Sequence, residues 1–142
     1  MHKLIRLILL INISMIILGG AISCSPLTKT NPASIPLDVT AIRAYADNAT
    51  ETTIQGLSEN NLAKYTQYFS TKTREAVTLD VFQNTAMQIN DQLGTYISKE
   101  FLRVEELSGY IIVHYKAKYS KGDVGLKMVF DKDNLIAGQW FE

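Results

Sequence analysis

Cysteine and proline are scarce in this chain, and their positions limit how it can be organised. The 142 residues contain one cysteine, Cys24, and three prolines, all between positions 26 and 36. A lone cysteine cannot form an internal disulfide, so the packing of a core must hold the fold together. The length allows one domain and is too short for two.

The chain also lacks an excess of charge of either sign. It carries 14 basic and 14 acidic residues, and the part from Cys24 onward carries 12 basic and 14 acidic residues, a net charge of −2. This balance gives no basic surface for nucleic acid. One cysteine and two histidines do not make a metal-ligand cluster, so we expect no metal and no cofactor.

The first 23 residues have the layout of a signal peptide. A basic start is followed by an apolar run over residues 7–18 and by small residues that end at Ser23. The run is shorter than the about 20 apolar residues that cross the hydrocarbon core of a bilayer. We therefore expect cleavage between Ser23 and Cys24.

The four residues Ala21-Ile22-Ser23-Cys24 resemble the lipobox of prokaryotic lipoproteins. The resemblance implies that residues 1–23 are removed and that Cys24 carries lipid, such as palmitate, at the mature N-terminus. Ala21 stands where leucine is commonest, and Ile22 where a small residue is usual. Two alternatives are an uncleaved N-terminal anchor and simple secretion with an incidental thiol. All three place the domain outside the cytosol, and the lipobox places it on the extracytoplasmic face of the cell membrane through a lipid anchor.

Residues 24–37 contain every proline and are interpreted as a lipidated N-terminus followed by a linker. An extended linker of this length reaches on the order of 40 Å from the membrane. The alternative is an ordered arm that packs on the domain. The domain itself is expected over residues 38–142.

Helical periodicity comes first in this domain and strand periodicity follows. Apolar residues three and four apart predict a helix over 39–57 capped by Asp38 or Thr40, a shorter helical stripe over 62–69, and a helix from Thr78 to Gly94. Alternating residues then predict four strands over 96–107, 110–119, 124–130 and 135–141, joined by short turns. The expected fold class is α+β, with N-terminal helices packed on a curved four-stranded antiparallel sheet.

The closing hairpin carries a second resemblance. Residues 129–138, Val-Phe-Asp-Lys-Asp-Asn-Leu-Ile-Ala-Gly, are similar to the end of the domain of unknown function 3887 family (DUF3887). That family is similar in layout to the nuclear transport factor 2-like (NTF2-like), or cystatin-like, cone. The resemblance covers about residues 40–142 and implies a fold with a pocket between sheet and helices, without implying a function.

Aromatic residues are the candidate lining of such a pocket, which would suit a small apolar or sugar-like ligand. The alternative is that most of these rings are simply core. The candidates are Tyr45, Tyr65, Tyr68, Phe69, Tyr115, Tyr119 and Phe141.

His114 is the one histidine of the expected domain. As a general base it would need Glu100 or Glu105 of the neighbouring strand to orient it. Its alternation with Lys116 favours a surface or interface position instead. No serine at a strand-to-helix turn and no glycine-rich loop before a helix is present, so no catalytic residue is assigned.

The last strand is partly apolar on both faces. A homodimer through the outer sheet face, with Tyr110, Ile112 and Trp140 in the seam, would cover the second face. The leading hypothesis is a membrane-anchored lipoprotein with a non-catalytic ligand-binding or accessory domain. The alternatives are a lyase- or isomerase-type enzyme that uses the cone pocket and a dimerising structural or protein-interaction module.

Overall fold

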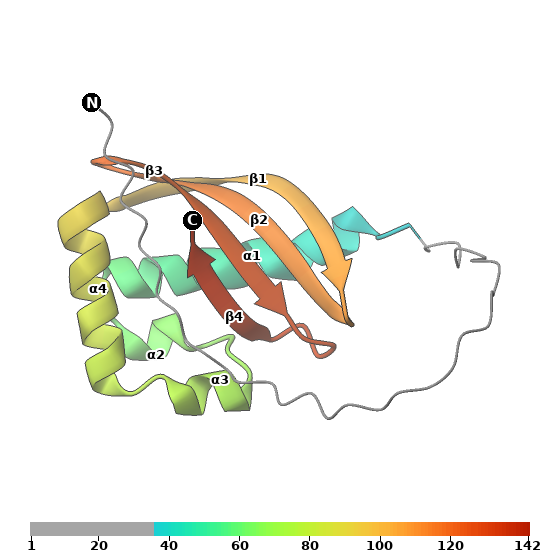
Figure 1. Ribbon diagram of the computed structural model, residues 1–142, viewed down its shortest axis with the longest axis horizontal. Coiled ribbons are helices and arrows are strands. Elements are labelled where there is room, and N and C mark those ends of the chain that lie inside the picture. Colours follow the sequence, from blue (N-terminus) through green and yellow to red (C-terminus); the bar gives the residue numbers. More distant parts are fainter. Residues whose placement is uncertain (1–35) are drawn as a thin grey trace, which may run out of the picture.

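A computed structural model describes residues 36–142, so the predicted leader, Cys24 and most of the linker lie outside the described residues. Four helices precede four strands (Figure 1). They are α1 (Val39–Ser58), α2 (Leu62–Tyr65), α3 (Thr71–Ala76), α4 (Leu79–Leu93), β1 (Tyr96–Leu107), β2 (Tyr110–Tyr119), β3 (Gly122–Phe130) and β4 (Ile136–Phe141). The predicted α+β class is confirmed.

Capping residues set the ends of the two long helices. The Asp38 carboxylate accepts a hydrogen bond from the Ala41 amide at 3.0 Å and caps α1, and Thr78 caps α4 by accepting from Val81 at 3.3 Å. Such a side chain satisfies an amide that has no partner within the helix. Gly94 ends α4 with a φ of +80°, a backbone angle that glycine adopts without strain.

The segment between the long helices differs from the prediction. The helical stripe expected over 62–69 holds only for α2, because the chain at Phe69 pairs with β4 as an isolated bridge to Ile136. The Ser70 amide donates to the Ile136 carbonyl at 2.9 Å, and these backbone bonds replace a second helical turn. Helix α3 buries no residue and therefore leaves no periodic signal in the sequence.

The sheet is an antiparallel meander in the order β1-β2-β3-β4. Register shifts interrupt β1 near Leu102 and β4 near Ala137. Because of the shift in β4, Ile136 pairs with Phe130 and is fully buried, so it does not share a face with Gly138 and Trp140. The bulge lets one short strand place apolar side chains on both faces.

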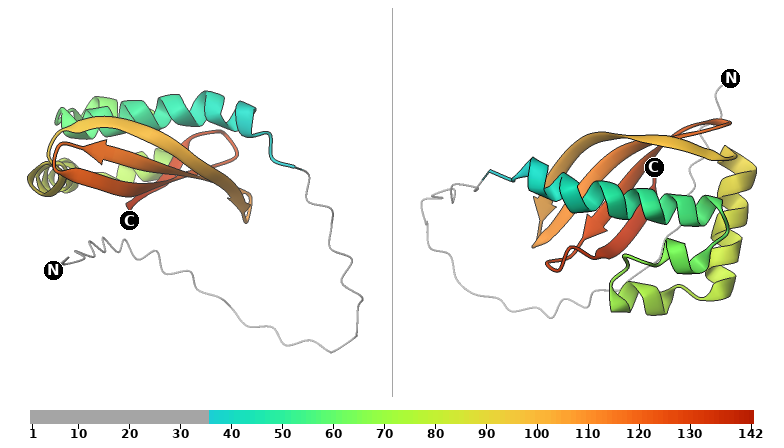
Figure 2. Two further views of the ribbon diagram at one scale, coloured as in Figure 1. Left: turned by 90° about the horizontal axis from the view of Figure 1, so that it is seen from above. Right: turned by 180° about the vertical axis from the view of Figure 1, so that it is seen from behind.

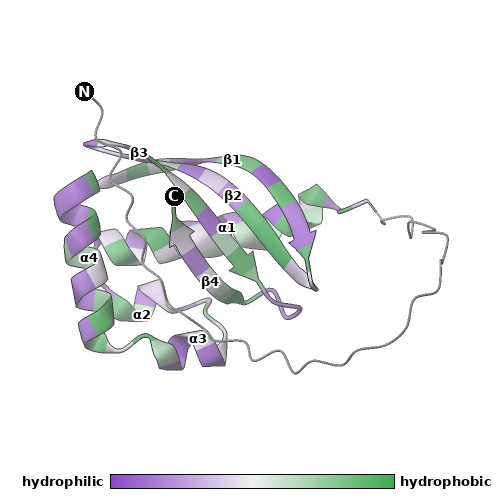
Figure 3. Ribbon diagram, in the orientation of Figure 1, coloured by the Kyte–Doolittle hydropathy of each residue, from purple (hydrophilic) through white to green (hydrophobic). Residues whose placement is uncertain are grey.

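The helices cover one face of the sheet, and the core lies between the two layers (Figure 2). Strand residues facing α1 include Val113, Tyr115, Leu126 and Met128, all at most 1% exposed. Figure 1 looks onto the opposite face, which none of the helices of residues 36–142 covers. Along the strands, hydrophobic and hydrophilic residues alternate as they do in a sheet with one buried face (Figure 3).

Among the helices of residues 36–142, none combines the length and apolarity needed to cross a membrane.

Candidate functional site

The aromatic residues proposed for a pocket lie in one hydrophobic core or pack against it. Tyr65 packs on Phe69 and Phe82, with ring centroids 5.0 and 5.2 Å apart. Beside Glu51 and Ser58, also in the C-terminal half of α1, Tyr119 packs on Tyr96 at 5.5 Å. Tyr65, Phe69, Tyr115 and Tyr119 are at most 8% exposed, whereas Tyr45, Tyr68 and Phe141 are partly buried against the same core.

Polar partners meet Tyr115 from α1. Its hydroxyl donates to Asp47 Oδ1 at 2.9 Å, while Arg43 donates to Asp47 Oδ2 through Nε at 3.0 Å and Nη2 at 2.9 Å. The Arg43 guanidinium also lies 4.6 Å from the ring centroid of Phe101. Both oxygens of this carboxylate are therefore occupied.

One helical turn later, Glu51 repeats the arrangement. Its Oε2 accepts from the Tyr96 hydroxyl at 2.8 Å and lies 3.3 Å from Lys99 Nζ, while Oε1 accepts from Gln55 at 2.9 Å. Only 12% of the Lys99 side chain is exposed, and its Nζ lies 5.2 Å from the centre of the Tyr115 ring. We call Arg43, Asp47, Glu51, Tyr96, Lys99 and Tyr115 the α1–β1 network.

Burial controls the acidity of the tyrosines in this region. Burial and the hydrogen bonds to Glu51 and Asp47 raise the pKa of Tyr96 and Tyr115, and burial alone raises the pKa of Tyr119. Burial also raises the pKa of Tyr65 to about 12. These hydroxyls are therefore neutral at physiological pH.

The sequence analysis missed five members of the α1–β1 network: Arg43, Asp47, Glu51, Tyr96 and Lys99. A signal was present, because Arg43, Asp47, Glu51 and Gln55 are spaced by four and line one flank of the predicted first helix. In the first strand, Lys99 and Phe101 are two residues apart, so strand alternation places both on the inner face of the sheet. The bulge near Leu102 obscured that alternation for the rest of the strand.

His114 shares the outer sheet face with Lys116, as the alternation predicted, but it is not exposed to solvent. It lies on the outer sheet face but is only 6% exposed, and its Nε2 is 2.8 Å from Glu105 Oε1 and 3.2 Å from Arg103 Nη2. Neighbouring strands flank it with Arg103 and Lys127 as register partners. Long side chains from both neighbours can cover the smaller imidazole.

The three residues proposed for a dimer face do share the outer sheet face. Tyr110 and Trp140 are 45% and 42% exposed, whereas Ile112 is 9% exposed. The Trp140 ring lies over Gly138, where a Cβ would overlap it, and Lys127 Nζ lies 5.1 Å from its centre. Leu107, the register partner of Tyr110, is 64% exposed.

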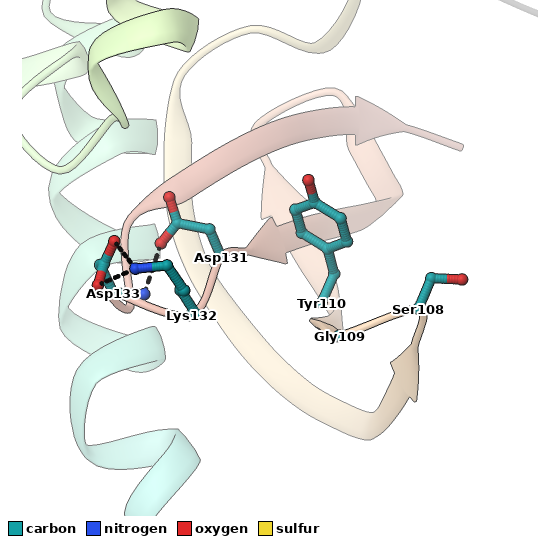
Figure 4. Close-up of a pocket in the computed structure, with 6 residues that line it drawn as sticks. All are labelled: Ser108, Gly109, Tyr110, Asp131, Lys132 and Asp133. Atoms are coloured by element: carbon teal, nitrogen blue, oxygen red, sulfur yellow. Dashed lines mark hydrogen bonds and ion pairs between the residues drawn. The ribbon is translucent and has the colours of Figure 1, made fainter. Parts of the chain in front are cut away.

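A hollow of about 290 Å³ adjoins Tyr110, where the β1–β2 turn lies near the β3–β4 loop (Figure 4). Its lining consists of Ser108, Gly109, Tyr110, Asp131, Lys132 and Asp133. One aromatic ring, two hydroxyls and three charged groups therefore surround a space open to solvent. No His, Cys, Asp and Glu side chains within residues 36–142 gather in a group of three or more that could hold a metal ion.

The comparison with protein families identifies the domain. A family model described as "Protein of unknown function (DUF3887)" matches residues 50–138, from the middle of α1 into β4. The chain belongs to the DUF3887 family. No curated protein and no solved structure matches it. The match includes four members of the α1–β1 network of this DUF3887 chain, Glu51, Tyr96, Lys99 and Tyr115, and the complete lining of the hollow.

Proposed function

We propose that the protein is a lipid-anchored domain on the extracytoplasmic face of the cell membrane that binds a ligand or partner without catalysing a reaction. We further propose that its DUF3887 domain is related to the NTF2-like cone. One observation carries the binding role: Tyr110 and Trp140 hold large, exposed aromatic rings on the sheet face that the helices leave uncovered. Tyrosine and tryptophan are enriched at binding interfaces, because each combines a large apolar ring with a polar group.

The anchor is argued from the lipobox-like residues Ala21 to Cys24. Two acyl chains on Cys24 would hold the protein stably, whereas a single chain binds a bilayer only marginally. The linker to the Asp38 cap would separate the domain from the membrane surface.

Metabolic labelling with a fatty acid tests the anchor. The wild-type chain should incorporate label and fractionate with membranes, and Cys24→Ala should do neither. Ser25→Ala, a change next to the same site, is the matched control and should be labelled like the wild type. Equal labelling of Cys24→Ala and the wild type would contradict lipidation at this residue.

The non-catalytic role is supported by the α1–β1 network. Asp47 and Glu51 each contact a cation and a tyrosine hydroxyl at 2.8–3.3 Å. Their carboxylate oxygens are therefore engaged within the protein and are not directed at a substrate proton. A general base must reach the proton that it abstracts. These contacts instead tie α1 to β1 and β2.

A lyase- or isomerase-type enzyme is the second candidate, because Asp47 lies within hydrogen-bond distance of the Tyr115 hydroxyl. Asp47→Asn separates the two roles, since the amide keeps the shape and can still accept from Tyr115. Full retention of the protein's cellular phenotype in this variant supports binding. Loss of the phenotype with an unchanged melting temperature supports catalysis.

A homodimer through Tyr110, Ile112 and Trp140 is the third candidate, favoured by the same exposed rings. Sedimentation of the full chain in detergent should show dimers if the outer faces pair, and Trp140→Ser should then yield monomers. Monomers in the wild type at high protein concentration would exclude this dimer.

A further inference from the structure

Building on the proposed binding role, we propose that the outer sheet face binds a neutral glycan chain, with one sugar ring stacked on Tyr110 in the hollow and another on Trp140. The C–H groups on one side of a sugar ring carry a small positive charge, which suits the negative face of an aromatic ring. Sugar hydroxyls then need polar side chains within reach, because an unmatched polar group lowers affinity.

The hollow beside Tyr110 supplies both kinds of contact. In Figure 4 the Tyr110 ring stands between Ser108 and Asp131, and its hydroxyl end projects to the same side as the Asp131 carboxylate. A ring flanked by a hydroxyl and a carboxylate offers a donor, acceptors and an apolar face to one sugar. The volume of about 290 Å³ is at the lower end of small-molecule sites, which suits one sugar ring rather than a larger group.

The loop holds Asp131 in place while leaving it able to accept. Its Oδ1 accepts from the amides of Asp133 at 2.9 Å and Leu135 at 3.0 Å. Within residues 36–142 no hydrogen bond uses Oδ2, so this oxygen can accept from a sugar hydroxyl. The exposed Lys132–Asp133 pair, with 84% and 61% of the two side chains accessible, can exchange its contact for a ligand at little cost.

Trp140 forms a second platform on the same face. Gly138 lets the indole lie against the backbone of β4, and Lys127 Nζ lies over the ring, 5.1 Å from its centre, where a partly exposed ammonium can move aside for a ligand. Lys127 Nζ also lies 3.0 Å from Glu142 Oε1, so a donor and an acceptor are present near this ring. The arrangement repeats the chemistry of the hollow.

The spacing of the two rings indicates an extended ligand. Trp140 is opposite Lys127, which is opposite His114, so the Tyr110 and Trp140 positions differ by four residues along the strands and two strands across. At about 3.3 Å per residue and about 4.8 Å per strand, their backbones lie on the order of 16 Å apart. A single sugar cannot cover both rings, whereas an oligosaccharide can.

A second protein copy fits this face less well. Between the rings, Ile112 is 9% exposed and offers little apolar area. The rim carries Lys116 paired with Asp123 at 2.8 Å and Glu105 beside Arg103 at 3.8 Å, and a dimer would have to desolvate such charges. A glycan leaves them in water.

The single tryptophan makes a direct test available, because its fluorescence reports contact at Trp140. The full chain in detergent would be titrated with N-acetylglucosamine and glucose oligomers, from the monosaccharide to the hexasaccharide. We expect the emission to change with one of the series and the affinity to rise with length until the ligand spans both rings.

Variants then separate stacking from other effects, with affinity measured by calorimetry. Tyr110→Ala and Trp140→Ala should each weaken binding of the hexasaccharide by about fivefold to tenfold, and Tyr110→Phe, which keeps the ring, should retain most of it. Met87→Ala, a change at a 57% exposed residue of α4, should have no effect.

Three results would overturn the proposal: no response to either series at concentrations on the order of ten millimolar, undiminished affinity in Tyr110→Ala, or dimers that Trp140→Ala dissociates without any glycan binding. The last result would favour a second copy as the occupant. Lipid labelling at Cys24 is independent of all three, so failure of the glycan proposal leaves the anchored binding role to be tested separately.

Discussion

Tyr115 shows how one side chain connects the core with the polar edge of α1. Its ring is 1% exposed, yet its hydroxyl reaches Asp47 Oδ1 at 2.9 Å. Tyr115→Phe removes this donor and leaves Asp47 to Arg43 alone, and we expect a loss of about 1–2 kcal/mol in the free energy of unfolding. Denaturant unfolding measures it. Tyr45→Phe is the control, because within the described residues the Tyr45 hydroxyl makes no hydrogen bond, and its effect should be close to zero.

Position 138 is a glycine, which leaves room for the Trp140 ring that lies over it. Gly138→Ala introduces a Cβ that overlaps the indole, and the ring can swing away because it is the end of a side chain. We expect a red-shifted tryptophan emission and little change in circular dichroism. An unchanged emission would mean that the indole does not lie over Gly138.

Glu105, on the outer sheet face, makes the stability of the protein depend on pH. Its hydrogen bond with His114 lowers the pKa of its carboxyl below the ordinary value of 4.5. A lowered pKa in the folded state contributes stability above that value, and this stability is lost as the pH falls through the folded pKa. The advantage of the wild type over Glu105→Gln in denaturant unfolding should therefore shrink below about pH 4.5. A difference that does not vary with pH would contradict the pairing.

At the scale of elements, α1 and α2 approach closely at Gly56. A Cβ on Gly56 would overlap backbone atoms of Tyr65, which cannot move without shifting α2. Gly56→Ala should therefore lower the free energy of unfolding by about 1–3 kcal/mol despite its favourable helix propensity. Gln55→Ala, at the preceding position, should cost less. Thermal unfolding of the two variants is the comparison, and a more stable Gly56→Ala would contradict the packing.

Elements with strong periodicity were predictable from the sequence, and those fixed by tertiary contacts were not. The helix over 39–57 and the four strands follow from the spacing of apolar residues, and Asp38, Thr78 and Gly94 mark ends that the structure confirms. Helix α3 and the Phe69 bridge depend on hydrogen bonds to β4, 64 or more residues away, which no local pattern shows.

The candidate site was predictable only in part for a similar reason. Strand alternation placed Tyr110, Ile112 and Trp140 on one outer face, as found. It also placed His114 on this face but did not predict its burial, which comes from long side chains of neighbouring strands. The hollow depends on two turns that are adjacent in space and far apart in sequence. The lipid anchor stays a prediction from the sequence.

For the whole molecule, the buried tyrosines predict how alkali unfolds it. Burial raises the pKa of Tyr45, Tyr65, Tyr96, Tyr115 and Tyr119 above the ordinary value of 10.0, to about 12 for Tyr65. Groups with a raised pKa stabilise the fold fully below pH 10 and lose this contribution as the pH rises toward the folded values. Tyrosinate absorbance and circular dichroism should therefore change together above about pH 10. Ionisation of all five with native circular dichroism retained would contradict their burial.

The central claim is that inward tyrosines hold the fold while the outward aromatic rings bind. Two double variants of the full chain test it, with the melting temperature and the glycan affinity measured for each. Tyr96→Phe with Tyr115→Phe should lower the melting temperature and leave the hexasaccharide affinity unchanged at temperatures where the variant is folded. Tyr110→Ala with Trp140→Ala should keep the melting temperature within a few degrees and abolish binding. The reverse pattern, with binding lost through the inward pair alone, would contradict the account.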